Sequence, residues 1–147
     1  MPASPLPDIR ATLFRPERLH RNPQVTVHGV ILDVPLAGGL DTLAAYVDGT
    51  ARYINHSGRT IIWEVPASKN TFRPLIDNFL AAASAIPQAG TPKGWDPPSI
   101  DGASSLVTVL TRTGLVTMTL GSDPTSARLL TSGAVLMKAL ISAVPAP

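Results

Sequence analysis

The sequence predicts an α+β domain in which a mostly antiparallel sheet of about six strands carries two amphipathic helices. Two observations lead to this prediction. Short segments that alternate apolar and polar residues are separated by tight turns, which makes consecutive strands antiparallel. Two longer segments repeat their apolar residues every three or four positions, as a helix buried on one face requires. The order of elements is β-β-β-β-α-β-β-α, and the 147 residues suit a single domain.

Six segments have the alternation expected of strands. In the first, Gly29 indicates a bulge or a close approach of another group to the backbone. Asp48-Gly49 is the strongest hairpin signal in the chain, because both residues tolerate a positive φ. In the fourth segment, Trp63 shares an apolar face with Ile61, and this face is expected to pack against the first helix. The predicted strands are residues 25–35, 42–47, 50–55, 60–65, 105–112 and 115–120.

The first helix is predicted from apolar spacing between residues 72 and 86. Asn70 or Thr71 can cap its start. Pro74 lies in its first turn, and Pro87 ends it. Its apolar face holds Phe72, Leu75, Ile76, Phe79, Leu80, Ala83 and Ile86.

The last helix is predicted from Asp123-Pro124, an N-cap followed by proline, to about Val144. Because its apolar residues cover more than one face, we expect one face to meet the sheet and another to meet a second copy of the chain. One face holds Leu130, Ala134, Met137, Ile141 and Val144, and the residues that widen it are Leu129, Val135, Leu136 and Leu140. The candidate interaction residues on this helix are Leu129, Leu136 and Leu140.

Residues 1–24 are predicted to form an extended arm, since their five prolines exclude one continuous helix. A short helical turn is expected near residues 12–14. The arginines of the arm could contact the phosphates of a nucleic acid. We favour an arm laid over the domain at residues 25–147, because acids lie among the arginines and the net charge of the chain is only +2.

Residues 87–103 are rich in Pro, Gly, Asp and Ser and are predicted to form one long surface loop. Loops of this length are usually functional or disordered. Trp95 is its candidate interaction residue, because an aromatic side chain on such a loop can anchor a partner. It can also pin the loop over the sheet, and we favour the pin.

Composition limits the chemistry of the chain. Without cysteine there can be no disulfide, thiolate nucleophile or cysteine-based zinc site, and this fits a reducing cytoplasm. The first residues lack the apolar core of a secretory signal, and no apolar stretch reaches the ~18 residues of a membrane span. We therefore expect a cytoplasmic location, no membrane partner and no cofactor. Charged residues are only 15% of the chain, which favours a buried self-interface.

No catalytic constellation is expected. His56 and Ser57 are adjacent in a tight turn, where neighbouring side chains diverge, so they do not make a nucleophile and base. Glu64 is one of two acids within predicted strands. It is expected to face solvent or to pair with Arg52 or Arg59 on the neighbouring strand segments.

Metal ligands are not clustered in the sequence. His28 and the other strand acid, Asp33, share a face only if Gly29 carries a bulge. We therefore favour a structural role for His28 over metal binding.

Turn and core residues recur in a recognisable order from residue 29 onward. They are Gly29-Val30, Thr42-Leu43, Asp48-Gly49-Thr50, Tyr53 and Gly58, followed by Ala81-Ala82-Ala83 in the first helix. With them the chain resembles an uncharacterised bacterial family of small α+β proteins whose pattern is GVLM…TL…ADGT…Y…GG. The resemblance covers residues 25–144 in element order. It implies the same fold and assigns no activity.

Taken together, these features favour a non-catalytic protein-interaction module, a homodimeric adaptor or regulatory protein whose partner is itself or another protein. The alternative is a small-molecule-binding domain or a weak enzyme with a pocket between the sheet and the 87–103 loop. Nucleic-acid contact through the arm is the least favoured of the three.

Overall fold

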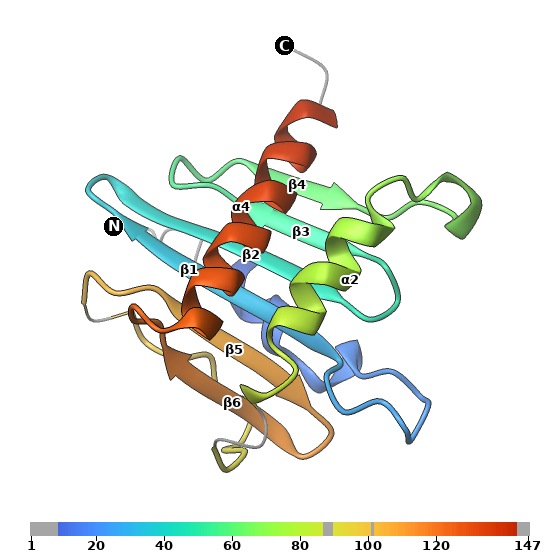
Figure 1. The fold of residues 1–147 in the computed structure, drawn as a ribbon, viewed down its shortest axis with the longest axis horizontal. Coiled ribbons are helices and arrows are strands. Elements are labelled where there is room, and N and C mark those ends of the chain that lie inside the picture. Colours follow the sequence, from blue (N-terminus) through green and yellow to red (C-terminus); the bar gives the residue numbers. More distant parts are fainter. Residues whose placement is uncertain (1–8, 87–89, 101, 144–147) are drawn as a thin grey trace.

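A computed structural model of the chain describes residues 9–86, 90–100 and 102–143 and has the expected α+β fold. Two helices lie side by side on one face of the sheet: α2 (Arg73–Ala82) and α4 (Pro124–Ala143) (Figure 1). The six strands are β1 (Gly29–Leu36), β2 (Gly39–Tyr46), β3 (Ala51–Ile54), β4 (Thr60–Trp63), β5 (Leu106–Thr111) and β6 (Gly114–Thr119). They form one antiparallel sheet in the spatial order β4-β3-β2-β1-β5-β6.

The first four strands form the expected antiparallel meander. Gly49 and Gly58 have φ values of 89° and 92° in the turns after β2 and β3, which is the conformation that favours glycine there. The chain then crosses the sheet through α2, and β5 pairs with β1 from Gly29↔Leu110 to Asp33↔Leu106. β1 is therefore paired on both sides and lies near the middle of the sheet.

β1 begins at Gly29, and the prediction of a strand from residue 25 was wrong at this end. The N–H of Val25 donates to the carbonyl of Asn22, closing a turn that directs the chain into the sheet. Gly29 marks a close approach and not a bulge, because the register with β2 is continuous. A Cβ at Gly29 would lie 2.6 Å from the ring of Tyr46.

α2 is shorter than predicted and is not capped by a side chain. Asn70 is committed elsewhere: its Oδ1 accepts the indole N–H of Trp63 at 2.9 Å, and its Nδ2 donates to the carbonyl of Gly49 at 2.9 Å. The capping role expected for Asn70 was therefore wrong. Pro74 does lie in the first turn. Pro87 and Val144, the predicted ends of the two helices, lie outside the described residues, as do residues 1–8 of the arm.

Strand alternation divides the apolar side chains into two cores. The core under the helices is built around Leu32, Leu43, Phe79, Leu129 and Leu136, all nearly or fully inaccessible to solvent. The core on the opposite face combines residues of five strands with two residues of the arm. Its members are Leu13, Phe14, Ile31, Ala44, Tyr46, Ile54, Leu110 and Leu115.

The arm therefore forms a third layer, on the face opposite the helices (Figure 1). It contains a short 3-10 helix, η1 (Thr12–Phe14), where a helical turn was expected, followed by η2 (Pro16–Arg18). Leu13 and Phe14 are at most 1% exposed. The prediction that the arm lies over the domain is confirmed for the described part of it.

The two edges of the sheet differ. At β6, Lys93 N–H donates to the carbonyl of Leu115, and Leu115 N–H donates to the carbonyl of Gly94, both at 2.9 Å. Residues 93–94 thus cover that edge at Leu115 with two backbone hydrogen bonds. At β4, no described residue pairs with the outer edge of the strand. An uncovered edge strand is a ready template for pairing with another chain.

Candidate functional site

The first half of the arm is anchored by an ion pair buried against the sheet. Asp33 in β1 is completely inaccessible, and the Arg10 guanidinium binds both of its oxygens, from Nε at 2.9 Å and from Nη2 at 2.7 Å. The hydroxyl of Thr42 donates to the same carboxylate at 2.7 Å. The guanidinium also lies 4.8 Å from the ring centre of Phe14. Asp33 is therefore a structural anchor with its acceptor sites used within the chain.

The second half of the arm is held by the end of the sheet. The N–H of His20 donates to Nδ1 of His28 at 2.8 Å. Arg112, in the turn between β5 and β6, donates from Nη2 to the carbonyl of Asn22 at 2.9 Å. Between the two halves, the hydroxyl of Tyr46 donates to the carbonyl of Leu13 at 2.7 Å.

His28 and Asp33, considered together as possible metal ligands, are not brought together. Each binds a different part of the arm, one through the backbone of His20 and the other through the side chain of Arg10. Burial and the positive charge of Arg112 lower the pKa of His28 below its ordinary value. A buried, neutral histidine that accepts a backbone N–H is a structural residue, as the sequence favoured.

A cluster of three side chains joins the β1–β2 and β3–β4 hairpins. Asp41 accepts the Tyr53 hydroxyl at 3.0 Å and the backbone N–H of His56 at 2.7 Å, and its Oδ1 lies 3.1 Å from Nδ1 of His56. Burial, together with the hydrogen bond to Asp41, raises the pKa of Tyr53 to about 12. The imidazole is half-exposed at the surface. Sequence reasoning missed this cluster, because Asp41 and His56 are far apart along the chain.

Ser57, which follows His56 in the same turn, binds a different residue. Ser57 Oγ donates to the side-chain oxygen of Asn55 at 2.7 Å, so His56 and Ser57 diverge as predicted. Glu64 pairs with Arg52 across β3 and β4, which confirms one of the two roles expected for it. Within the described parts of the chain, no group of three or more His, Asp or Glu side chains could hold a metal ion.

Trp95 packs against the arm-side core and is partly buried. The backbone bonds of Lys93 and Gly94 to β6 hold the loop immediately before it. These contacts favour a role for Trp95 in fixing the loop on the sheet over a role as an exposed anchor for a partner. Beside it, a cavity of about 320 Å³ lies between the loop and β6, where the alternative pocket was expected. Its described lining is Gly90, Thr91, Lys93, Asp96, Leu115, Val116 and Thr117.

The three leucines proposed for an interface on α4 face the sheet. Leu129, Leu136 and Leu140 are inaccessible to solvent, so their assignment as interaction residues is corrected. Their face closes on the sheet because Gly133 lies among them: a Cβ there would come within 2.7 Å of Leu32. The other predicted face of the helix, which includes Leu130, Met137 and Ile141, is turned partly toward solvent, and Ile141 is 52% exposed.

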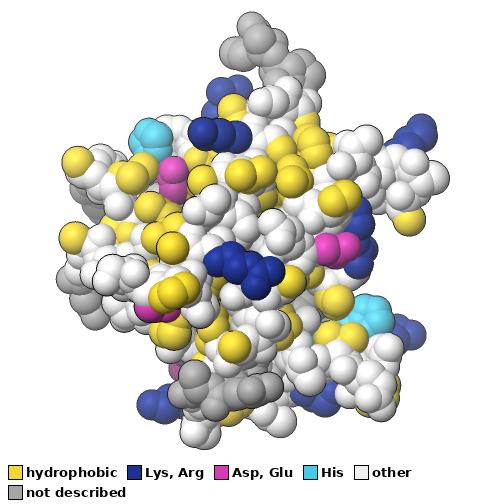
Figure 2. All heavy atoms as spheres, viewed as in Figure 1, with side chains coloured by type: hydrophobic (Ala, Val, Ile, Leu, Met, Phe, Trp, Pro, Cys, Tyr) yellow, Lys and Arg dark blue, Asp and Glu magenta, His cyan; other side chains and the backbone are white. Residues whose placement is uncertain are grey.

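Apolar groups are exposed on the side of the molecule formed by β4 and the C-terminal half of α4, which packs over it. We call this the β4 side. Ile62, on the strand, is 60% exposed, the highest value among the large hydrophobic residues that the structure describes. Ile62 projects from the face opposite the helices, because its neighbours Ile61 and Trp63 pack into the core under the helices. Ile141, on α4, is exposed on the helix-bearing face, and Val135, one to two turns earlier, is 46% exposed beside α2. Hydrophobic side chains appear in patches across the helix-bearing face, with isolated basic groups between them (Figure 2).

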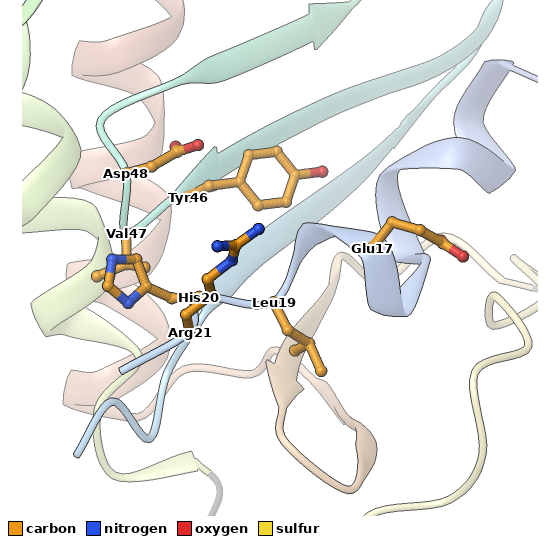
Figure 3. A pocket seen from close by; sticks show the side chains of 7 residues that line it. All are labelled: Glu17, Leu19, His20, Arg21, Tyr46, Val47 and Asp48. Atoms are coloured by element: carbon orange, nitrogen blue, oxygen red, sulfur yellow. The ribbon is translucent and has the colours of Figure 1, made fainter. Parts of the chain in front are cut away.

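A cavity of about 490 Å³ lies between the arm and the turn after β2. We call it the arm cavity. Arg21 extends from the arm toward Tyr46, and Asp48 projects from the turn (Figure 3). The remaining lining residues are Glu17, Leu19, His20 and Val47. Both charge signs are present, so its electrostatics do not favour an anion or a cation.

No family model, curated protein sequence or solved structure matches this chain. The resemblance to an uncharacterised bacterial family and the cytoplasmic location stay predictions. No helix in the described residues is long and apolar enough to cross a membrane.

Proposed function

We propose that this domain is a non-catalytic protein-interaction module that works as a homodimer, as an adaptor or regulatory protein, and that the β4 side is its self-interface. The observation that carries the proposal is the contrast between the two sheet edges. The β6 edge is bonded at Leu115 by residues 93–94, whereas the outer edge of β4 has no partner among the described residues. The uncovered edge also bears Ile62, the most exposed large hydrophobic residue of those described.

Two further features support a protein partner at this position. Exposed apolar side chains flank the unpaired edge on both faces of the sheet, Ile62 on the arm face and Ile141 on α4, and such groups beside a free strand edge are typical of a protein interface. The chain is also short of charged residues, at 15%, which leaves little electrostatic repulsion between copies. β4 has only four residues, so pairing along the strand alone would not bury the ~1,200 Å² of a small stable interface. The exposed end of α4 is needed as well.

Sedimentation equilibrium at micromolar concentration tests the proposal. The wild-type chain should sediment at about twice its mass of 15.4 kDa. Ile62→Lys and Ile141→Lys should each shift it to the monomer, because each places a charge in the proposed interface. Neither side chain is in the core, so the monomeric variants should stay folded, with a melting midpoint lowered only by the loss of the stabilisation that dimerisation gives.

Leu36→Lys is the matched control. Leu36 is 43% exposed at the end of β1 and lies away from the β4 side, so this variant should remain dimeric. A wild-type monomer would refute the homodimer. If both Ile62→Lys and Ile141→Lys remained dimeric, the homodimer would stand but its interface would not be the β4 side.

The small-molecule alternative is supported by the cavity beside the loop. Its volume, about 320 Å³, is at the lower end of the ~300–1,000 Å³ usual for ligand sites. Native mass spectrometry of the purified protein should then show a stoichiometric adduct that Val116→Trp removes by filling the cavity. Purification without any adduct would leave the interaction module as the better-supported function.

A further inference from the structure

His28 occupies the point where the arm rejoins the sheet. Its backbone continues the sheet: its N–H donates to the carbonyl of Leu110 at 2.9 Å, and its carbonyl accepts the N–H of Val47 at 3.0 Å. Its side chain is inaccessible to solvent and accepts the N–H of His20 at Nδ1. The other ring nitrogen, Nε2, is buried without a hydrogen-bond partner among the described residues.

This geometry requires the neutral ring. A nitrogen that accepts a hydrogen bond cannot carry a proton, so the single ring proton is on Nε2. Protonation of Nδ1 would remove the only acceptor that the ring offers to the arm. It would also place a full charge in a buried site, which is costly without a counter-ion.

The groups around the ring oppose that charge. Arg112, from the β5–β6 turn, carries a positive charge near the ring, and its guanidinium is held there by the carbonyls of His20 and Asn22. His20, from the arm, acts in the same direction when protonated. Only the backbone carbonyl of Val25 favours the protonated ring. The charged form of His28 is therefore tolerated only if the arm moves away and water reaches the ring.

We propose that His28 is a proton-operated latch for the second half of the arm: its protonation releases residues 19–24 from the sheet and opens the arm cavity. The first half stays in place, because Arg10 and Asp33 hold it without any histidine. The Tyr46 hydroxyl retains Leu13 in the same way. The arm is thus held at two points of different chemistry, the Arg10–Asp33 ion pair and the His20–His28 hydrogen bond, and only the second responds to protonation of His28.

The sign of the pH dependence follows from linkage. The attached arm favours neutral His28, so attachment is complete above the ordinary histidine pKa of 6.5 and weakens as the pH falls below it. While the attached form remains neutral, the opening equilibrium should increase about tenfold for each pH unit. The charge on Arg112 makes the lowered pKa of the attached form salt-sensitive as well.

Amide hydrogen exchange on the full chain tests the latch. Between about pH 8 and about pH 5, after correction for intrinsic rates, amides in residues 19–24 should lose protection while those of β1 and β2 keep it. The imidazole resonances of His28 should report a transition with the same midpoint. Unchanged protection of residues 19–24 across this range, or a different midpoint for His28, would overturn the proposal.

Variants separate His28 from the other two histidines. His28→Asn keeps an acceptor close to the position of Nδ1 but cannot be protonated, so the arm should stay attached at low pH. His56→Gln is the control, since His56 lies in the distant cluster with Asp41, and it should keep the wild-type transition. If His20→Gln abolished the transition while His28→Asn retained it, His20 would control the release of the arm, and the proposal for His28 would be refuted.

Discussion

The two faces of the sheet are covered by different means. The helix face is closed by α2 and α4, whose side chains contribute mainly apolar contacts such as those of Phe79 and Leu136. The arm face is closed by a segment with very little regular structure, of which Leu13 and Phe14 are buried in the core and Ile9 and Leu19 pack partly against it. Burial of so few side chains is too little to order an arm of this length against its conformational entropy. Directed polar contacts supply the remainder.

This difference shows how a segment without helical or strand periodicity can still belong to the folded domain. Each half of the arm has its own long-range anchor, Arg10 to Asp33 and His20 to His28. A helix can slide or repack while keeping its apolar contacts, whereas these bonds specify one position. The arm face should therefore depend on few residues, and the helix face on many.

The largest expected effect is at the buried ion pair. Asp33→Ala should lower the free energy of unfolding by about 3–5 kcal/mol, because it leaves the Arg10 guanidinium largely buried without its counter-charge. Chemical denaturation monitored by circular dichroism measures the change. Asp77→Ala is the matched control: it breaks the exposed pair with Arg73 and should cost about 0.5 kcal/mol or less.

Replacing both members of the buried pair sharpens the comparison. Arg10→Met combined with Asp33→Leu should recover much of the loss, since apolar residues of similar volume often substitute for a buried pair. A loss below about 1 kcal/mol for Asp33→Ala alone would show that the arm is held mainly by Leu13 and Phe14.

The two tryptophans compare the faces directly. Trp63 lies on the helix face, stacks on Phe72 with ring centres 4.4 Å apart and donates to Asn70, so Trp63→Ala should cost about 3 kcal/mol. Trp95 contacts the arm-side core from the loop, so Trp95→Ala should cost about 1–2 kcal/mol. Denaturant midpoints of the two variants give the values.

Equal losses of unfolding free energy for Trp63→Ala and Trp95→Ala would contradict this ranking. They would show that the 90–100 loop contributes as much to stability as the edge of the helix-side core around Trp63. An unchanged midpoint for Trp63→Ala would mean that its stacking and hydrogen bond contribute nothing net.

The smallest expected effect is an alkaline transition at Tyr53, on the helix side of the sheet. Its pKa is raised from 10.0 to about 12, so folding favours the neutral phenol. Stability from this group is complete below pH 10 and is lost as the pH rises from about 10 to about 12. Tyr53→Phe should remove that component of the alkaline loss, measured by thermal melts across this range. A Phe variant with the wild-type alkaline profile would assign the loss to other groups.

The sequence alone determined the elements and which side chains alternate along them. The Asp48-Gly49 turn, the alternation around Ile61 and Trp63, and the proline-marked start of α4 are local signals, because they depend on backbone preferences and residue spacing. The α+β class and the element order could be predicted for that reason. The face of α4 that packs on the sheet could not be predicted, because apolar residues surround the helix. Gly133 marks the face that approaches the sheet closely, but only the folded structure places Leu32 opposite it.

The tertiary structure decided the pairing of β5 with β1 and the anchoring of the arm. Neither the pairing nor the contacts of Arg10, Asp33, His28 and Asp41 leave a signal in local sequence, since each joins residues from different elements. His28 and Asp33 stand out in the sequence as polar residues of an apolar strand segment, but their partners come from a segment that composition describes only as an arm. Long-range polar contacts depend on where the chain returns, and periodicity does not encode that position.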